Sequence, residues 1–115
     1  DIVTTLLIFP DRFQQFDDFL DLLADAEDSL IQNNYEGVYQ VASFHPQYIF
    51  GGTPVNDAAN YTNRSVYPML HLLREAQMDE ALERYPNPDN IPNNNILFAR
   101  EKGIQYMKML RNACL

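Results

Sequence analysis

Residues 2–44, IVTTLLIFPDRFQQFDDFLDLLADAEDSLIQNNYEGVYQVASF, predict a strand, a helix and a second strand. Ile2–Phe9 is rich in β-branched and large apolar residues and stops at Pro10, which lacks a backbone donor, so it predicts a largely buried strand. Phe13–Gln32 has a helical period, with Phe and Leu on one side and Asp on the other, and predicts an amphipathic helix. Val38–Phe44 predicts the second strand. Because two strands joined by a helix are typically parallel, this order predicts a parallel βαβ unit with a right-handed connection.

The rest of the chain predicts a long loop followed by helices. Residues 45–65 form the loop, in which Tyr48–Phe50 is expected to add a short edge strand. Further helices are expected over Pro68–Ala76, Met78–Tyr85 and, weakened at Gly103, 92–113. The predicted fold class is therefore α+β: a small sheet with a parallel βαβ unit, packed by amphipathic helices, with a helical C-terminal part. At this length, residues 1–115 are expected to form a single, compact α+β domain.

The net charge of −8 is concentrated in the first third of the chain, where residues 1–37 contain nine acidic residues and one basic residue. Nucleic-acid affinity comes chiefly from Lys and Arg that neutralise phosphates, so neither nucleic acid nor an anionic membrane surface is an expected partner. The acidic helix face is expected either to maintain solubility or to dock a basic partner. No apolar run approaches the ~18 residues of a membrane span, so membrane insertion is not expected. A single cysteine, Cys114, predicts neither an internal disulfide nor a Cys-based zinc site.

Two long motifs resemble a known family. They are ASFHPQYIFGGT at Ala42–Thr53 and DAANYTNRSVYPMLHLLRE at Asp57–Glu75. Over Thr4–Gly103 the sequence resembles the family catalogued as domain of unknown function 1415. The resemblance implies an α+β sandwich and brings no established activity. Where that family has Arg-Ser-Pro-Tyr-Pro, this chain has Val66 in place of the first proline.

Members of that family usually carry an additional N-terminal region with a Cys-Pro motif and at least one more strand and helix. This chain is expected to lack that segment. It starts with Asp1 rather than Met, so we expect that it is processed or begins inside a longer chain.

A candidate site lies in the loop and at its end. His45 follows the second predicted strand, and ligands of open α/β sheets collect beyond the carboxyl ends of strands. Arg64 and Ser65 precede the helix predicted from Pro68, and helix N-termini attract anions. The prediction is a pocket for a small anionic ligand in which His45 is the catalytic acid or base and Asp57 orients it. The ligand-binding set is Asn60, Tyr61, Asn63, Arg64 and Ser65.

The same residues also fit a structural role, in which His45 and Arg64 bond loop carbonyls and the Asn side chains form turns. A weaker candidate is a metal site at His71 and Glu75, which are four residues apart on the predicted helix. No metalloenzyme motif accompanies them, so no metal site is predicted there, and no cofactor is expected.

Three functional hypotheses remain. The first is an accessory or interaction subunit of a larger assembly, which docks through an open sheet edge or the acidic helix and has a protein partner. The alternative is a small-molecule binding domain or an enzyme of hydrolase or transferase type, with its site in residues 45–68. The third is a stabilising fragment of a larger chain. The interior of a cell or organelle is favoured over secretion as the location.

Overall fold

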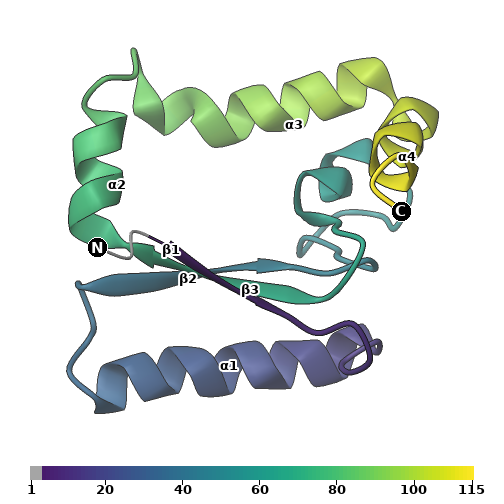
Figure 1. The fold of residues 1–115 in the computed structure, drawn as a ribbon. Helices are drawn as coiled ribbons and strands as arrows, with labels where there is room; N and C mark the ends of the chain where they lie inside the picture. The colour runs from purple at the N-terminus through teal and green to yellow at the C-terminus, as the bar shows by residue number, and fades with distance from the viewer. Residues whose placement is uncertain (1–3) are drawn as a thin grey trace.

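The computed structural model describes residues 4–115, and it consists of a three-stranded sheet with helices on both sides (Figure 1). Ile2 and Val3 of the predicted first strand lie outside the described part. The elements in chain order are β1 (Thr4–Ile8), α1 (Phe16–Gln32), β2 (Tyr39–Phe44), the 3-10 helix η1 (Ala58–Asn63), β3 (Met69–Arg74), α2 (Glu75–Leu82), the 3-10 helix η2 (Pro88–Asn90), α3 (Ile91–Lys102) and α4 (Ile104–Asn112).

The sheet is antiparallel with the strand order β1-β3-β2, so the predicted parallel βαβ unit is wrong. β3 lies between the two strands that were expected to pair. His71 at its centre is opposite Leu6 of β1 and Ala42 of β2. Because each outer strand is antiparallel to β3, β1 and β2 run in the same direction without being neighbours.

The helix predicted over Pro68–Ala76 is also wrong, because Met69–Arg74 is the central strand. Its sequence MLHLLR places apolar residues at both helical and alternating spacings, so the local pattern fits either structure. Hydrogen bonding to strands on both sides favours the extended form. α2 begins directly after this strand, three residues before the expected start of the next helix.

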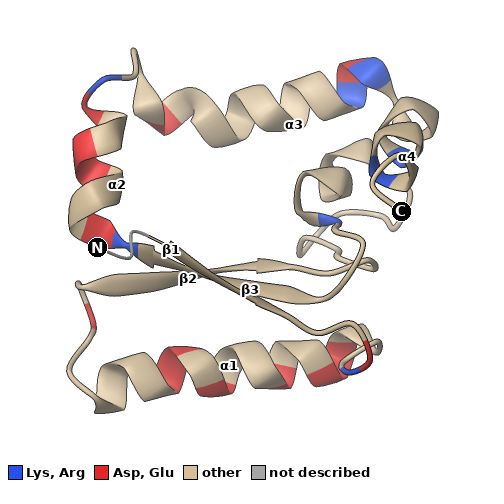
Figure 2. Cartoon of the chain, viewed as in Figure 1, with Lys and Arg blue, Asp and Glu red and all other residues tan. Residues whose placement is uncertain are grey.

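α1 confirms the predicted amphipathic helix. Phe19 is completely buried, and α1 packs on β2. The aspartates and the glutamate of α1 are exposed, and Figure 2 shows them along the length of the helix. The helix ends at Asn33 and Asn34, and Asn34 has φ +61°, a left-handed conformation that Asn tolerates.

The predicted C-terminal helix with a break at Gly103 is confirmed as the pair α3 and α4. Gly103 lies between them with φ +87° and ψ 162°, a conformation accessible mainly to glycine. Figure 1 shows α2, α3 and α4 as an arch on the side of the sheet opposite α1. α3 packs chiefly on η1 and α4.

β1 is much more exposed than the buried strand that the sequence predicts. Leu6, Leu7 and Ile8 are 51%, 43% and 49% exposed. The reason is its place at the edge of the sheet, while α1 packs on β2. Tyr48–Phe50, expected as a short edge strand, is irregular loop.

The molecule is more open than the compact domain expected. A compact chain of this length has a radius of gyration of about 13 Å, and this one has 15.2 Å. Its accessible surface is 8091 Å², against about 6,500 Å² expected for a folded monomer of this mass. Among the helices of residues 4–115, none combines the length and apolar character that crossing a membrane requires.

Candidate functional site

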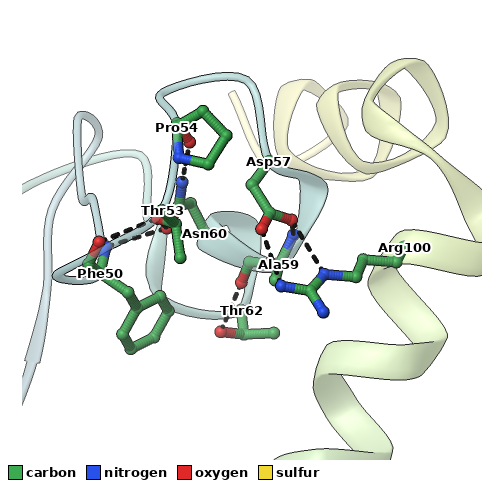
Figure 3. A network of polar contacts seen from close by, with 8 residues as sticks. All are labelled: Phe50, Thr53, Pro54, Asp57, Ala59, Asn60, Thr62 and Arg100. Carbon is green, nitrogen blue, oxygen red and sulfur yellow. Dashed lines mark hydrogen bonds and ion pairs between the residues drawn. The ribbon is translucent and has the colours of Figure 1, made fainter.

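The polar loop, residues 45–65, is held by side chains that bond its own backbone (Figure 3). Asn60 is completely buried in η1 and organises one half of the loop. Its Oδ1 accepts the backbone N–H of Phe50 at 2.9 Å and the hydroxyl of Thr53 at 3.1 Å. Its Nδ2 donates to the carbonyl oxygen of Pro54 at 3.0 Å. Since a buried amide needs all these partners, Asn60 fixes the loop path from residue 50 to residue 60.

Asp57 caps η1 and connects the polar loop to α3. Its Oδ1 accepts the backbone N–H of Ala59 at 2.9 Å, as an N-cap side chain does. Arg100 donates to both carboxylate oxygens, from Nε to Oδ1 at 3.2 Å and from Nη2 to Oδ2 at 2.8 Å. The hydrogen bonds from Arg100 and then Ala59 lower the pKa of Asp57 below its ordinary value of 3.8. Asp57 is thereby held as a carboxylate that orients a helix.

His45 is completely buried at the end of β2 and uses both ring nitrogens within the fold. Nε2 bonds the carbonyl oxygen of Phe13 at 2.8 Å, and Nδ1 accepts the backbone N–H of Gln47 at 3.0 Å. These partners assign the proton to Nε2 and make the ring a neutral imidazole. The ring also packs on Phe16 and Phe19, with centroid distances of 5.2 and 5.0 Å. His45 and Asp57, expected to act together, therefore bond different partners.

Asn63 and Arg64 join the end of the polar loop to its beginning. Asn63 donates from Nδ2 to the carbonyl oxygen of Ser43 at 2.8 Å. Arg64 donates from Nε to the carbonyl oxygen of Tyr48 at 2.9 Å and from Nη2 to that of Val55 at 2.8 Å. These bonds match the structural role that the sequence left open, and they still leave donors on the Arg64 guanidinium.

The helix N-terminus expected beside Arg64 and Ser65 is not formed, because β3 follows. The Ser65 hydroxyl instead donates to the carbonyl oxygen of Tyr67. The anion-binding hypothesis for this segment therefore loses the contribution of a helix dipole. It keeps the positive charge of Arg64 and the backbone around Ser65.

Arg64 lines two hollows. One has a volume of about 530 Å³ and lies at the start of α1, where Gln15, Asp17 and Gln47 contribute polar groups. The other, of about 310 Å³, is lined by Arg64 and Ser65 together with Arg111 near the end of α4. Asp17 brings a negative charge to the first hollow, whereas the lining of the second contains no carboxylate. The surface of the second hollow is almost wholly apolar.

The Tyr61 ring contacts two arginines. Its ring centroid is 4.7 Å from the guanidinium carbon of Arg64 and 5.4 Å from that of Arg111. Tyr61 is buried, and its ring makes a cation–π contact with each of the two guanidinium groups. Sequence analysis missed Arg111, because it is 47 positions after Arg64 and no local motif includes it.

The two residues of the weaker metal candidate lie in different secondary-structure elements. His71 lies in the middle of β3, where its Nε2 contacts the hydroxyl of Thr4, while Glu75 begins α2. Within residues 4–115, no three His, Cys, Asp or Glu side chains group as metal ligands. Cys114, two residues after the end of α4, is exposed as a free thiol.

Comparison with protein families matches residues 1–109 to the family described as Protein of unknown function (DUF1415). Comparison with curated proteins finds no significant match, and neither does comparison with solved structures.

Proposed function

The chain belongs to the DUF1415 family, and from its geometry we propose that it acts as an interaction subunit whose β1 pairs with β1 of a second copy. The observation that carries the proposal is the exposed edge strand. β1 bonds β3 on one side, and its other side borders no strand among the described residues. Leu6, Leu7 and Ile8 on this edge are each about half exposed. Exposed edge strands with apolar side chains are templates for strand addition.

The sequence of β1 suits pairing with itself. TTLLI has no charged residue, so two copies that meet antiparallel bring no like charges opposite each other. Leu6 shares a sheet face with His71, and Leu7 shares the other face with Leu70, so a partner strand covers apolar side chains on both faces. The pairing would extend two three-stranded sheets into one of six strands.

The charge distribution favours β1 over β2 as the docking edge. α1 carries six acidic residues and no basic residue, and it packs on β2, the strand farthest from β1. In a six-stranded sheet joined through β1, the two β2 strands lie roughly 24 Å apart, at about 4.8 Å per strand. That separation is several times the screening length of about 8 Å at physiological salt, so the two acidic helices repel weakly. Joining through β2 would bring them close together.

The enzymatic alternative has less support from the geometry. The nitrogens of His45 both have partners, and its ring is buried between Phe side chains of α1. Asp57 binds Arg100 and Ala59. The catalytic roles expected for His45 and Asp57 stay predictions. The two side chains bond different partners, and this geometry does not favour a joint role.

Sedimentation analysis over a range of protein concentrations tests the interaction proposal. We expect the full chain to form a dimer, and Leu6→Lys to abolish it, because two lysines would face each other across the new strand pair. Leu97→Lys on α3 is the matched control, since Leu97 is 62% exposed but lies away from β1, and it should dimerise as the parent chain does. A parent chain that stays monomeric throughout contradicts the proposal, as does a dimer that survives Leu6→Lys.

A further inference from the structure

The second edge of the sheet is the outer side of β2, at the opposite end of the strand order from β1. Where the chain enters β2, the backbone N–H of Glu75 donates to the carbonyl oxygen of Val38 at 2.9 Å. Bonding to a neighbour alternates along an antiparallel strand, so Gln40 also directs its backbone groups toward β3. Tyr39 and Val41 therefore direct theirs toward the open edge, where no strand lies among the described residues.

The open part of this edge is short. At its start, the N–H of Tyr39 donates to the carbonyl oxygen of Tyr35 at 3.1 Å, and at its end the carbonyl oxygen of Ser43 accepts Nδ2 of Asn63 at 2.8 Å. Between these bonds, the carbonyl oxygen of Tyr39, both backbone groups of Val41 and the N–H of Ser43 have no partner among residues 4–115. Such a row of free groups is what an added strand pairs with.

A hollow of about 220 Å³ lies beside this open edge, between β2 and the C-terminal half of α1. Leu30 and Ile31 of α1 and Tyr39 and Val41 of β2 line it, and Ile31 is 54% exposed. Because Tyr39 and Val41 belong to both the edge and the hollow, a segment that pairs with β2 can place an apolar side chain there.

Three carboxylates also line this hollow, those of Glu27, Glu36 and Glu75, and its lining contains no cation. In the described part of the chain, none of the three belongs to an ion pair. Arg74 precedes Glu75, but its guanidinium carbon lies 5.5 Å from the ring centroid of Tyr39, and Arg74 does not line the hollow. The edge of β2 is therefore bordered by negative charge that a basic partner would complement.

We propose that the open edge of β2 pairs with an extended basic segment of a partner protein. The segment bonds the backbone of Val41, places an apolar side chain in the hollow and brings Lys or Arg to the three glutamates. Since every second side chain of a strand shares a face, the segment has the pattern basic, any residue, apolar, any residue, basic. The same carboxylates disfavour a second copy of this acidic chain at β2. This inference concerns the other edge of the sheet and does not depend on dimerisation through β1.

Fluorescence anisotropy of a labelled model peptide tests the proposal with the unmodified full chain at about 150 mM salt. The peptide Thr-Lys-Thr-Val-Thr-Lys-Thr carries the pattern. One control peptide has glutamate in place of both lysines, and the other has an N-methyl group on the valine, which removes the N–H that bonds β2. We expect the lysine peptide to bind at least about tenfold more tightly than either control, because each control removes one of the two recognition features.

A pair of double variants tests the site on the protein. Glu27→Gln with Glu36→Gln should weaken binding of the lysine peptide by at least about fivefold. Asp17→Asn with Asp18→Asn is the matched control, because it changes the net charge of the chain equally and none of these aspartates lines the hollow. Asp18 is about 14 Å from Glu27 along the helix axis, beyond the screening length of about 8 Å, so the control should change binding by less than about twofold.

A third variant separates the two edges of the sheet. Leu6→Lys alters β1 and should bind the lysine peptide within about twofold of the parent chain. Loss of binding in Leu6→Lys would place the peptide at β1 and overturn the choice of β2. Similar affinities for the lysine and glutamate peptides overturn the proposal, as does full binding of the N-methylated peptide. Absence of measurable binding of the lysine peptide to the parent chain overturns it as well.

Discussion

Asn60 is the residue on which the polar loop depends most. Its completely buried amide bonds Phe50, Thr53 and Pro54. Asn60→Ala removes all three bonds and leaves the backbone N–H of Phe50 without a partner inside the described part of the fold. We expect a loss of about 2–4 kcal/mol in the free energy of unfolding, measured by urea denaturation. Asn56→Ala in the same loop is the control, because Asn56 is exposed, and it should change stability by less than about 0.5 kcal/mol. Similar losses for both variants would contradict this role of Asn60.

Asp57 makes stability depend on pH in a defined direction. The hydrogen bonds from Arg100 and Ala59 lower its pKa in the folded chain below 3.8, so the unfolded chain binds the proton more readily. The stabilisation is complete well above pH 3.8 and is lost as the pH falls through the lower pKa of the folded state. We expect Asp57→Asn to lose less stability than the parent chain over this acidic range, when both are followed by denaturation at a series of pH values.

Glu80→Gln provides the comparison for that experiment. Glu80 pairs with Arg84 at 3.7 Å, and both side chains are well exposed to solvent. An exposed pair of this kind contributes little, so the pH dependence of Glu80→Gln should parallel that of the parent chain. If Asp57→Asn follows the same curve as well, the ion pair with Arg100 does not stabilise the fold.

For single residues, the sequence predicted which polar side chains belong to the loop but not which groups they bond. His45, Asn60, Asn63 and Arg64 do lie in one ordered loop. They bond backbone carbonyl or N–H groups, and such groups carry no signature in a side-chain pattern. Arg111 reaches the same region from the other end of the chain, which only the tertiary fold reveals.

Among the secondary-structure elements, those with one clear period were predictable. α1 has apolar residues on one side only, and the break at Gly103 marks the join of α3 and α4. The prediction for β3 was wrong because MLHLLR is apolar at both helical and alternating spacings. Its structure is decided by pairing with two strands far away in the sequence. That error also placed a helix N-terminus at the predicted anion site, where the structure has none, and it left the two outer strands as a parallel pair in the prediction.

The join between α3 and α4 allows a direct test of a backbone effect. Gly103 has φ +87°, and a Cβ at this position would meet no atom within 4 Å, so the cost of Gly103→Ala comes from backbone conformation alone. We expect a loss of about 1–3 kcal/mol in the free energy of unfolding, measured by chemical denaturation. Gly51→Ala is the control, because Gly51 also has open space but no positive φ, and it should be nearly neutral. Equal stability of the two variants would show that the join readily adopts another conformation.

For the molecule as a whole, the uneven charge predicts how salt affects self-association. Six acidic residues and no basic residue lie on α1, and pairing through β1 keeps the two copies of α1 far apart. We expect the dimer dissociation constant to change by less than about threefold between about 50 and 500 mM salt, because screened charges at that distance contribute little. Sedimentation equilibrium measures this directly. A dimer that strengthens about tenfold or more with salt would place the acidic helices in the interface instead.

The late position of β3 in the chain affects synthesis on the ribosome. Both outer strands and α1 are complete by residue 44, whereas their common partner is complete only at residue 74. At about 5–20 residues per second, translation leaves two apolar strands unpaired for roughly two to six seconds. A chaperone that recognises extended apolar segments has that interval in which to bind the nascent chain, and the sheet closes only after release.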